Sequence, residues 1–312
     1  MQTVLVTGGA GFIGSNISAE LIKRGYNVKV LDNLSTGHLE NLESIKDKIK
    51  FIKGDINDHD LLLQELKDVD FVLHQAALPS VPRSVDAPLD SHLHNATGTI
   101  NLLEAAKKSG VKRVVCASSS SVYGDAKEEY KSENLPNLPL SPYAVAKMMN
   151  EHYCRVFSQL YGIETVSLRY FNVFGPNQDP QSDYAAVIPL FIKAILKDKQ
   201  PTIFGDGSQS RDFTYVQNNV EANILAMTSD KVGQGEAINI ACGKSYTLIE
   251  LIDTINKILD KDIKANFSDP RPGDIKHSLA DISRAKELLG YEAKFDFAEG
   301  LKQTIDWVKQ NV

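Results

Sequence analysis

Two tyrosine–lysine pairs are the residues whose types and spacing can do acid–base chemistry. Tyr143 and Lys147 lie four residues apart in the stretch SPYAVAK, and Tyr123 and Lys127 repeat that spacing. A tyrosine hydroxyl has a reference pKa of about 10, so at neutral pH it is a poor base. A nearby ammonium group and the positive end of a helix dipole both favour the phenolate. A tyrosine in such a setting can act as a general base.

The local sequence favours the pair at 143 and 147. Ser141 can cap a helix, Pro142 suits its first position, and the apolar-rich run Met148–Leu160 continues it. Residues four apart on a helix share one face. The other tyrosine is followed by Gly124 and by a polar stretch, Asp125–Asn134, which indicates a loop. Spacing alone still leaves an ordinary helical tyrosine as the more frequent outcome, so other parts of the chain must decide.

A glycine-rich turn near the N-terminus predicts a dinucleotide site. The strand Thr3–Thr7 runs into glycines at positions 8, 11 and 14 and then into a helix, Ser15–Arg24. Such glycines let backbone N–H groups approach a pyrophosphate at a helix N-terminus. The next strand, Asn27–Leu31, ends at Asp32. An acid there can bind ribose hydroxyls and repel a 2′-phosphate, which favours NAD over NADP. The alternative is that Asp32 is an ordinary surface aspartate at a strand end.

Further strands and helices alternate along the N-terminal half. Strand-like runs at 51–52, 71–74 and 113–117 are separated by helical stretches at 59–67 and 89–108. This alternation predicts an α/β fold with a doubly wound parallel sheet of the Rossmann type, with ligands at the carboxyl ends of the strands. Those ends supply Asp55 and Ile56 for an adenine, the small residues Ala76 and Ala77, and four serines at 118–121, for which a polar loop is the alternative.

Composition narrows the class and the compartment. The chain has 312 residues, 42% of them hydrophobic and 24% charged, a net charge of −6 and no dense basic block. Nucleic acid and an anionic membrane are therefore not expected partners, and no apolar run of membrane-spanning length is found. Three separated cysteines, at 116, 154 and 242, indicate reduced thiols and a cytoplasmic setting. His92 and His94 have no companion ligands, so we expect a surface or packing role and no metal.

Taken together, these motifs resemble the extended short-chain dehydrogenase/reductase superfamily over nearly the whole chain. Within it the chain is most similar to the NAD-dependent sugar-nucleotide epimerases, in particular the bacterial UDP-N-acetylglucosamine 4-epimerases. The motifs that carry the resemblance are His74–Ala77, Ser80–Ser84, Ser141–Val145, Arg169–Gly175, Tyr184–Pro189 and Arg271–Asp274.

The resemblance implies a catalytic set of Ser119, Tyr143 and Lys147. It also explains the second tyrosine, because Tyr123 fills the Val-Tyr-Gly motif that follows the catalytic serine by four residues. The cofactor residues implied are Gly8, Gly11, Phe12, Ile13, Gly14, Asp32, Asn33, Ser35, Thr36, Gly37, Asp55, Ile56, Gln75, Ala76, Ala77, Asn95, Tyr143, Lys147 and Tyr170.

After Leu168 the sequence leaves the strand–helix alternation for loops with scattered polar residues. Arg211 and Arg271 lie in separate Gly/Pro/Ser-rich loops and can grip a diphosphate through forked hydrogen bonds, although solvated arginines are the usual alternative. The resemblance implies that these arginines and Asn172 bind the UDP diphosphate, that Ala186 and Val187 line the uracil pocket and that Asp274 holds the ribose. The full substrate set is Ser80, Arg83, Ser119, Ser120, Ser121, Tyr143, Asn172, Ala186, Val187, Thr202, Arg211, Arg271, Asp274 and Ser278.

The C-terminal half predicts a smaller α/β substrate domain interleaved with the first. Helices are expected at 216–227, 247–259, 283–289 and 298–308, and a strand at 236–241 returns to the first domain. The NAD-binding domain would comprise 1–170 and about 213–243, and the UDP-sugar-binding domain about 171–212 and 244–312. The resemblance implies a homodimer packed through helices near 89–108 and 143–160.

Two places refine the expected substrate. Ser278 aligns with a gatekeeper that is a bulky tyrosine in enzymes restricted to UDP-glucose and UDP-galactose, so a serine leaves room for an N-acetyl group. Ser120 and Ser121 replace the acids of similar dehydratases and decarboxylases, which favours simple epimerisation. The predicted function is NAD-dependent 4-epimerisation of UDP-GlcNAc/UDP-GalNAc and of UDP-Glc/UDP-Gal. The alternatives are a UDP-glucuronate 4-epimerase and a non-catalytic NAD or sugar-nucleotide sensor.

Overall fold

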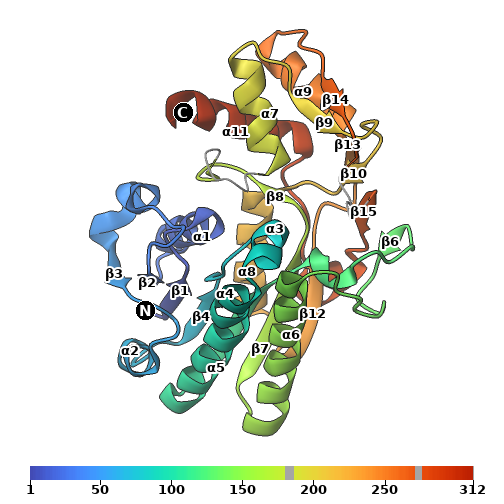
Figure 1. Cartoon of the computed structure of the whole chain (residues 1–312). Coiled ribbons are helices and arrows are strands. Elements are labelled where there is room, and N and C mark those ends of the chain that lie inside the picture. Colours follow the sequence, from blue (N-terminus) through green and yellow to red (C-terminus); the bar gives the residue numbers. More distant parts are fainter. Residues whose placement is uncertain (180–185, 271–275, 312) are drawn as a thin grey trace.

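The computed structural model describes residues 1–179, 186–270 and 276–311. Its centre is a parallel sheet, which within these residues has seven strands in the order β12-β7-β5-β4-β1-β2-β3 (Figure 1). The predicted doubly wound parallel sheet is therefore confirmed. The strands are β1 (Thr3–Thr7), β2 (Asn27–Asp32), β3 (Ile49–Lys53), β4 (Phe71–His74), β5 (Arg113–Ser119), β7 (Glu164–Tyr170) and β12 (Gln234–Ile240).

Helices cover both faces of this sheet because its strands are apolar on both sides. In β1, Val4 and Val6 face a core shared with α1 and α8, whereas Leu5 faces a core shared with α2, α5 and α6. The helices are α1 (Phe12–Lys23), α2 (His59–Glu65), α5 (Gly98–Ser109), α6 (Pro142–Tyr161) and α8 (Val216–Thr228). Figure 1 shows α5 and α6 side by side, where they pack together.

A smaller lobe stands over the carboxyl ends of the strands (Figure 1). Its sheets join β13 (Tyr246–Thr247), β10 (Ser210–Arg211), β15 (His277–Ala280) and β6 (Tyr130–Lys131); β9 (Thr202–Phe204) and β14 (Asn266–Ser268); and β8 (Val173–Phe174) and β11 (Thr214–Tyr215). Its helices are α7 (Val187–Leu196), α9 (Leu248–Leu259) and α11 (Phe297–Asn311), whereas α10 (Ser283–Leu289) packs against β12 and α8 of the larger part. The expectation of loops after Leu168 is wrong in one respect, because the apolar run that forms α7 is a helix. The domain boundaries stay a prediction.

Short helical turns connect the larger elements. They are the 3₁₀ helices η1 (Leu39–Lys48) and η3 (Ser120–Tyr123), the one-turn helices α3 (Val81–Asp86) and α4 (Pro88–His92), and a π-helical turn, η2 (Leu93–Thr97). Tyr123 ends η3 just before Gly124, whose φ is 56° and where a Cβ would lie 1.8 Å from the Leu138 carbonyl oxygen. Only glycine fits there, so no helix continues from Tyr123 toward Lys127.

The predicted start of α6 is confirmed in detail. Pro142 is its first residue, and the Ser141 side chain accepts a hydrogen bond of 3.2 Å from the Ala144 N–H. This cap satisfies one of the free donors of the first turn. Tyr143 and Lys147 therefore lie on one face at the N-terminal end of a long helix, as their sequence predicted.

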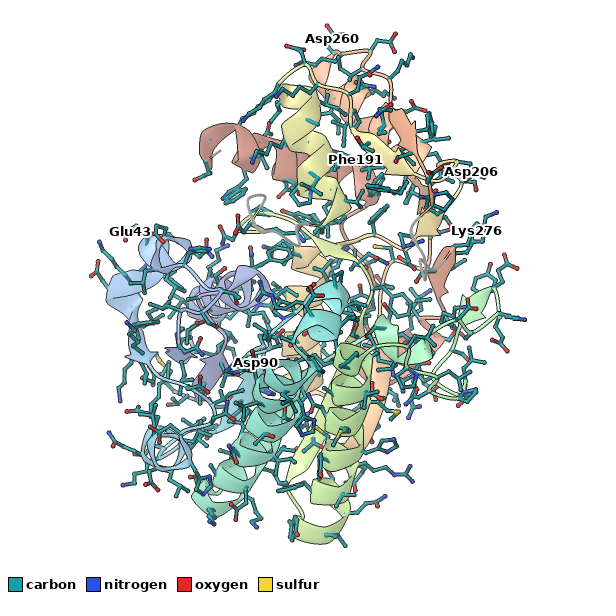
Figure 2. The ribbon with its side chains drawn as sticks, in the orientation of Figure 1. Glu43, Asp90, Phe191, Asp206, Asp260 and Lys276 are labelled. Atoms are coloured by element: carbon teal, nitrogen blue, oxygen red, sulfur yellow. The ribbon has the colours of Figure 1, made fainter. Side chains whose placement is uncertain are left out.

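The surface is charged, and the smaller lobe is apolar inside. Figure 2 shows Glu43, Asp90, Asp260 and Lys276 directed outward from different elements, whereas Phe191 of α7 is only 4% exposed. Among the described residues, no helix combines the length and the hydropathy needed to cross a membrane.

Gly300 in α11 offers a test of the packing of the smaller lobe. A Cβ at this position would lie 2.7 Å from Cβ and 2.6 Å from Cγ of Tyr215, a buried ring whose hydroxyl donates to Gln303. Gly300→Ala gains about 1 kcal/mol of helix propensity, but overpacking of a core costs about 1–3 kcal/mol. We therefore expect a net loss of about 1 kcal/mol in the free energy of unfolding, measured by urea denaturation. The exposed Lys302→Ala of the same helix is the control, and a Gly300→Ala protein at least as stable as the wild type would contradict the packing argument.

Candidate active site

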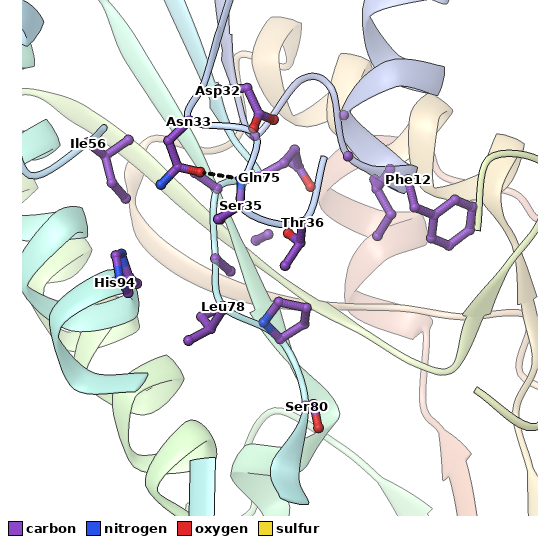
Figure 3. Close-up of a pocket in the computed structure, with 18 of the residues that line it drawn as sticks. Phe12, Asp32, Asn33, Ser35, Thr36, Ile56, Gln75, Leu78, Ser80 and His94 are labelled. Atoms are coloured by element: carbon purple, nitrogen blue, oxygen red, sulfur yellow. Dashed lines mark hydrogen bonds between the residues drawn. The ribbon is translucent and has the colours of Figure 1, made fainter. Parts of the chain in front are cut away.

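A cavity of about 640 Å³ opens at the carboxyl ends of the parallel strands. The glycine-rich turn, the ends of β2, β4 and β5, and the first turns of α6 surround it (Figure 3). The predicted site residues that line it are Gly8, Gly11, Phe12, Ile13, Gly14, Asp32, Asn33, Ser35, Thr36, Asp55, Ile56, Gln75, Ala76, Ala77, Ser80, Arg83, Tyr143, Lys147, Tyr170 and Ala186.

The glycine-rich turn gives the cavity an anion-binding end. Gly8 has a φ of 65°, and a Cβ on it would lie 2.6 Å from the Ala76 backbone nitrogen. A Cβ on Gly14 would lie 2.2 Å from the Gly8 carbonyl oxygen. Gly11 caps α1 without any side-chain hydrogen bond to the first turn. The N-terminus of α1 therefore reaches the cavity with uncovered N–H groups and a positive dipole end, which suits the pyrophosphate of a dinucleotide.

Asp32 occupies the position that a ribose requires. Its Oδ2 accepts from the Ala10 N–H at 2.9 Å, and its Oδ1 accepts from the Leu34 N–H at 2.8 Å. These bonds fix the carboxylate at the cavity wall and leave each oxygen a second lone pair for ribose hydroxyls. The chemistry of this end of the cavity therefore fits the adenosine half of NAD.

Asp55, Asn33 and His94 form the neighbouring wall. Asn33 donates to Asp55 at 2.7 Å. Burial raises the pKa of Asp55, but hydrogen bonds from Asn57 and Asn33 outweigh it, so the pKa lies below its ordinary value. Figure 3 shows His94 and Ile56 on the same side of the cavity as Asn33. His94 thus lines the cavity, a position that the sequence did not predict. The histidine lies in the π-turn η2, a feature often found at functional sites but invisible in helical periodicity.

Asn95 supports the cavity from behind. Its Oδ1 accepts from the Leu78 N–H at 3.0 Å, and its Nδ2 donates to the Leu78 carbonyl at 3.1 Å. The side chain thereby holds the loop that carries Leu78 and Ser80. Asn95 does not itself line the cavity, and neither does Gly37, whose Cα packs against the Asp32 carboxylate.

The structure brings Ser119, Tyr143 and Lys147 together. The Ser119 side chain is hydrogen-bonded to Tyr143. The Lys147 ammonium lies 5.8 Å from the centre of the Tyr143 ring and donates to the Ala117 carbonyl at 2.9 Å. Ser120 and Ser121 lie next to this group in η3, outside the cavity lining. The three groups form a set in which a proton can pass between a tyrosine and a bound hydroxyl.

Burial sets the charge of this group. It raises the pKa of Tyr143 to about 12, against the lowering effect of the Ser119 hydrogen bond. It lowers the pKa of Lys147 to about 8, against the charges of Cys116, Cys154 and Glu151. The expectation that the lysine and the helix dipole give a phenolate is therefore not met by the residues of the chain alone. When bound, NAD⁺ would supply a further positive charge, on its nicotinamide ring, that favours the phenolate.

The predicted substrate residues divide into two groups. Ser80 and Arg83 reach the cavity, and Ser80, with a φ of 96°, caps α3 by accepting from the Arg83 N–H at 3.2 Å. Ala186 and Tyr143 also line the cavity. Five further predicted residues lie in the smaller lobe outside the cavity lining: Asn172, Val187, Thr202, Arg211 and Ser278. Tyr184, Ala185, Arg271 and Asp274 lie outside the described residues.

Arg211 and Ser278 are direct neighbours in the smaller lobe. They face each other in the register of β10 and β15, and Arg211 donates to the carbonyls of Ser210 and Lys276 at 2.9 and 3.1 Å. Asn172 adopts a φ of 37°, a strained value that asparagine tolerates, and donates to the Asp212 carbonyl at 3.4 Å. Thr202 is exposed on β9.

Several lining residues have no counterpart in the predicted set. Ala117 and Ser118 come from the end of β5; Ser118 is one of the four serines predicted there, but the sequence assigned a role to neither residue. Most of the others lie in loops whose shape the sequence does not reveal. The complete set is Leu31, His38, Gly54, Leu78, Pro79, His94, Ala117, Ser118, Gln178 and Asp179. Within the described part of the chain, no cluster of three or more His, Cys, Asp or Glu residues could hold a metal ion.

This arrangement defines a dinucleotide-binding α/β protein with an acid–base group beside the cofactor site. Residues 4–241 match the NAD dependent epimerase/dehydratase family, and the chain belongs to that family. The predicted superfamily and the predicted cofactor, NAD, are therefore confirmed.

Known relatives match the chain from end to end. The UDP-N-acetylglucosamine 4-epimerase of Methanobrevibacter ruminantium, solved with UDP-N-acetylmuramic acid, is 46% identical with a TM-score of 0.95 and covers 100% of this chain and 99% of its own. The UDP-glucose 4-epimerase of Thermus thermophilus, solved with NAD, is 36% identical with a TM-score of 0.91 over 100% of both chains. The UDP-glucuronate 4-epimerase of Thermodesulfobacterium geofontis is 36% identical over 100% of this chain and 98% of its own.

The carboxylate of Asp32 provides a test of the cofactor site. Asp32→Asn removes the charge from the group placed at the ribose, and hydrogen bonds to charged groups contribute about 1.5–3 kcal/mol. We expect the dissociation constant of NAD⁺ to rise about 10- to 100-fold while that of NADP⁺ rises less or falls, measured by calorimetric titration of nucleotide-free protein. Asp47→Asn, an exposed carboxylate with the same charge change, is the control. An unchanged ratio of the two constants would remove Asp32 from the ribose site.

Proposed function

We propose that this protein is an NAD-dependent UDP-hexose 4-epimerase acting on UDP-GlcNAc and UDP-GalNAc as well as on UDP-Glc and UDP-Gal. The observation that carries the proposal is the group of Ser119, Tyr143 and Lys147 beside a dinucleotide cavity. Relatives that match the whole chain are named as UDP-sugar 4-epimerases, which supports the same reaction class.

In the proposed reaction Tyr143 is the base. Its phenolate removes the proton of the sugar 4-hydroxyl, and the Ser119 hydroxyl hydrogen-bonds the 4-oxygen. Bound NAD⁺ supplies the acceptor, and later the donor, of the hydride of C4. Lys147 holds the nicotinamide ribose and stabilises the phenolate by its charge. When the 4-keto sugar has turned about its diphosphate, Tyr143 returns the proton and the opposite configuration results.

The smaller lobe would hold the nucleotide while the sugar turns. Arg211 and Asn172, with Arg271 from beyond the described residues, are proposed to bind the diphosphate, and Asp274 the uridine ribose. Ala186 reaches the cavity as the cap of α7, which supports the proposed uracil pocket of Ala186 and Val187. Ser80 and Arg83 line the cavity, consistent with their proposed contact with the sugar.

Ser278 is proposed to select the sugar. It is 9% exposed and lies opposite Arg211 in adjacent strands, so a residue that contacts the sugar and one that holds the diphosphate can be neighbours. A small side chain there leaves room for an N-acetyl group when the sugar rotates. The proposal therefore includes N-acetylated sugars among the substrates.

Tyr143→Phe tests the base directly. Removing the hydroxyl leaves no group to take the 4-hydroxyl proton, and general base catalysis contributes about 100- to 10,000-fold. We expect turnover of UDP-GlcNAc to fall by at least about 100-fold while NAD and UDP still bind, measured by chromatographic separation of the two epimers. Tyr161→Phe, an exposed tyrosine at the end of the same helix, is the control. Turnover near that of the wild type in Tyr143→Phe would exclude Tyr143 as the base.

Ser278→Tyr tests the selection of the sugar. The larger ring would occupy the space proposed for the N-acetyl group and leave a plain hexose less affected. We expect kcat/KM for UDP-GlcNAc to fall about 10-fold or more relative to that for UDP-Glc, measured for both substrates on one preparation. Ser268→Tyr, on an exposed strand of the same lobe, is the control. An equal loss for both substrates would count against Ser278 as the selecting residue.

A UDP-glucuronate 4-epimerase is the second candidate. Arg83 at the cavity offers a cation to a uronate carboxylate, and one full-length relative has this name. Incubation with UDP-Glc, UDP-GlcNAc and UDP-GlcA separately distinguishes the candidates by which 4-epimer forms. The absence of product from all three would favour a non-catalytic NAD or sugar-nucleotide sensor.

We also propose a homodimer packed through the helices near 89–108 (α4, η2 and α5) and near 143–160 (α6), with α3 beside them. These helices pack together and expose large apolar side chains, and the resemblance to dimeric epimerases suggests a second copy as the partner that covers them. The exposed apolar residues are Val81, Val85, Leu89, Leu93, Val145, Val156, Leu160 and Tyr161.

A further inference from the structure

A buried ion pair lies one helical turn beyond the catalytic lysine. Tyr143, Lys147 and Glu151 follow one another at intervals of four on α6, so they share a face. Glu151 is 6% exposed and faces Arg169 of β7, which is 4% exposed. The guanidinium holds the carboxylate with a fork of two bonds, Nε to Oε1 at 2.8 Å and Nη2 to Oε2 at 2.7 Å. The Glu151 carboxylate is therefore a buried group held at a defined position, one helical turn beyond Lys147.

The carboxylate also fastens the strand that carries Ser119. The Ser118 hydroxyl donates to Glu151 Oε1 at 2.5 Å, and Lys147 donates to the carbonyl of the preceding residue, Ala117. Two side chains of α6 thereby bind consecutive residues of β5. Ser119 follows directly, so this attachment sets its position relative to Tyr143.

The far side of Arg169 is satisfied by neutral partners. Nη1 donates to the Tyr123 hydroxyl at 2.8 Å, and Nη2 donates to Asn137 Oδ1 at 3.1 Å. The Tyr123 hydroxyl in turn donates to Asn239 at 2.7 Å. The guanidinium therefore remains charged and fixed, and it is not free to approach Lys147. Glu151 and Arg169 also border a second cavity, of about 470 Å³, away from the catalytic one.

Stability alone does not explain a charged pair at this place. Replacement of a buried ion pair by apolar residues is often neutral or stabilising, because the desolvation of two charges offsets their attraction. The neighbourhood of Lys147 suggests a different use. Burial lowers the pKa of Lys147 to about 8, and Cys116, Cys154 and Glu151 act against this. A hydrogen bond to Cys154 and burial raise the pKa of the Cys116 thiol, and of these three groups Glu151 is the one held in an ion pair.

We propose that Glu151, held by Arg169 and Ser118, is a positioning residue that keeps Lys147 charged and fixes Ser119 against α6. The inference rests on the proposed function, in which the Lys147 cation stabilises the Tyr143 phenolate. Other titratable groups also face Lys147. They are His74 of β4, whose pKa burial lowers to about 3, Cys116 of β5, and Tyr143 and Cys154 of α6.

Glu151→Gln tests the charge while it keeps the shape of the side chain. Without the carboxylate, burial and the remaining Arg169 cation both disfavour a charged Lys147, so its pKa falls further. We expect the alkaline limb of the pH profile of kcat/KM for UDP-Glc to move down by about one pH unit or more. We expect kcat to fall while KM changes less than about two-fold, because Glu151 lies outside the nucleotide site. An unshifted alkaline limb would overturn the inference.

A matched control lies on the same two strands. Arg113 and Glu164 face each other at the N-terminal ends of β5 and β7, whereas Ser118 and Arg169 lie near the C-terminal ends. Arg113 Nε donates to Glu164 Oε2 at 2.7 Å. Glu164→Gln breaks this ion pair far from Lys147, so the pH profile should stay that of the wild type. A limb that moves equally in both variants would mean a general loss of structure and would overturn the inference.

The double variant Glu151→Gln/Arg169→Gln separates charge from folding. A single substitution leaves an unpaired buried charge, at a cost of about 3–5 kcal/mol, whereas the double variant leaves none. We expect the double variant to regain thermal stability while its alkaline limb stays below that of the wild type, by less than in Glu151→Gln because the Arg169 cation is also absent. Recovery of the wild-type profile together with stability would show a structural role only.

A measurement without turnover distinguishes this inference from the proposed function. The pKa of Lys147 can be read from the ¹³C shift of its ε-carbon in labelled protein, with Lys147→Arg to assign the signal. We expect a lower pKa in Glu151→Gln than in the wild type, whether or not any sugar is epimerised. An unchanged lysine pKa would refute the role of Glu151. An inactive wild type would refute only the proposed epimerisation.

Discussion

The hydrogen bond from the Lys147 ammonium to the Ala117 carbonyl is the interaction on which the arrangement of the site depends. An ammonium that is 3% exposed must keep its donors bonded, because an unpaired buried charge costs several kcal/mol. This requirement fixes the rotation of α6 about its axis relative to β5. Tyr143, one turn earlier, then faces the cavity, and Ser119, two residues along the strand, comes within hydrogen-bonding distance of it. A helix cap and a strand end that are far apart in the chain thus meet in one geometry.

The same burial explains why the site depends on its cofactor. A buried phenol resists ionisation, and the residues of the chain keep the pKa of Tyr143 at about 12. The remaining positive charge that fits the cavity is that of oxidised nicotinamide. In the proposed reaction, bound oxidised nicotinamide would favour the phenolate, and the neutral reduced ring would let the pKa of the hydroxyl rise again. The low dielectric of the site links proton transfer to the state of the cofactor without a moving part.

Local signals made much of this predictable from the sequence. The strand–glycine–helix turn, the cap at Ser141 and Pro142, and the glycine after Tyr123 act over a few residues, and the structure has each of them. The position of His94 at the cavity was not predicted, because hydrophobic periodicity does not reveal a π-turn. The bonds of Glu151 to Ser118 and to Arg169 were also missed, because these partners lie 33 and 18 positions away and only the packed sheet brings them together. The helix α7 was overlooked because its apolar run follows a polar segment.

The connection between the two lobes explains how the residue proposed to select the sugar keeps its place relative to the hydride site. Asp212 is fully buried, and its carboxylate accepts from the N–H groups of Cys242 and Gly243, at 2.9 Å each, and of Ala280 at 3.3 Å. The first two follow the end of β12 in the central sheet, and the third belongs to β15, two residues from Ser278. Arg211 precedes Asp212 directly. One buried side chain therefore fixes the smaller lobe to the large sheet, and the space for the rotating sugar is set by rigid elements rather than by loops.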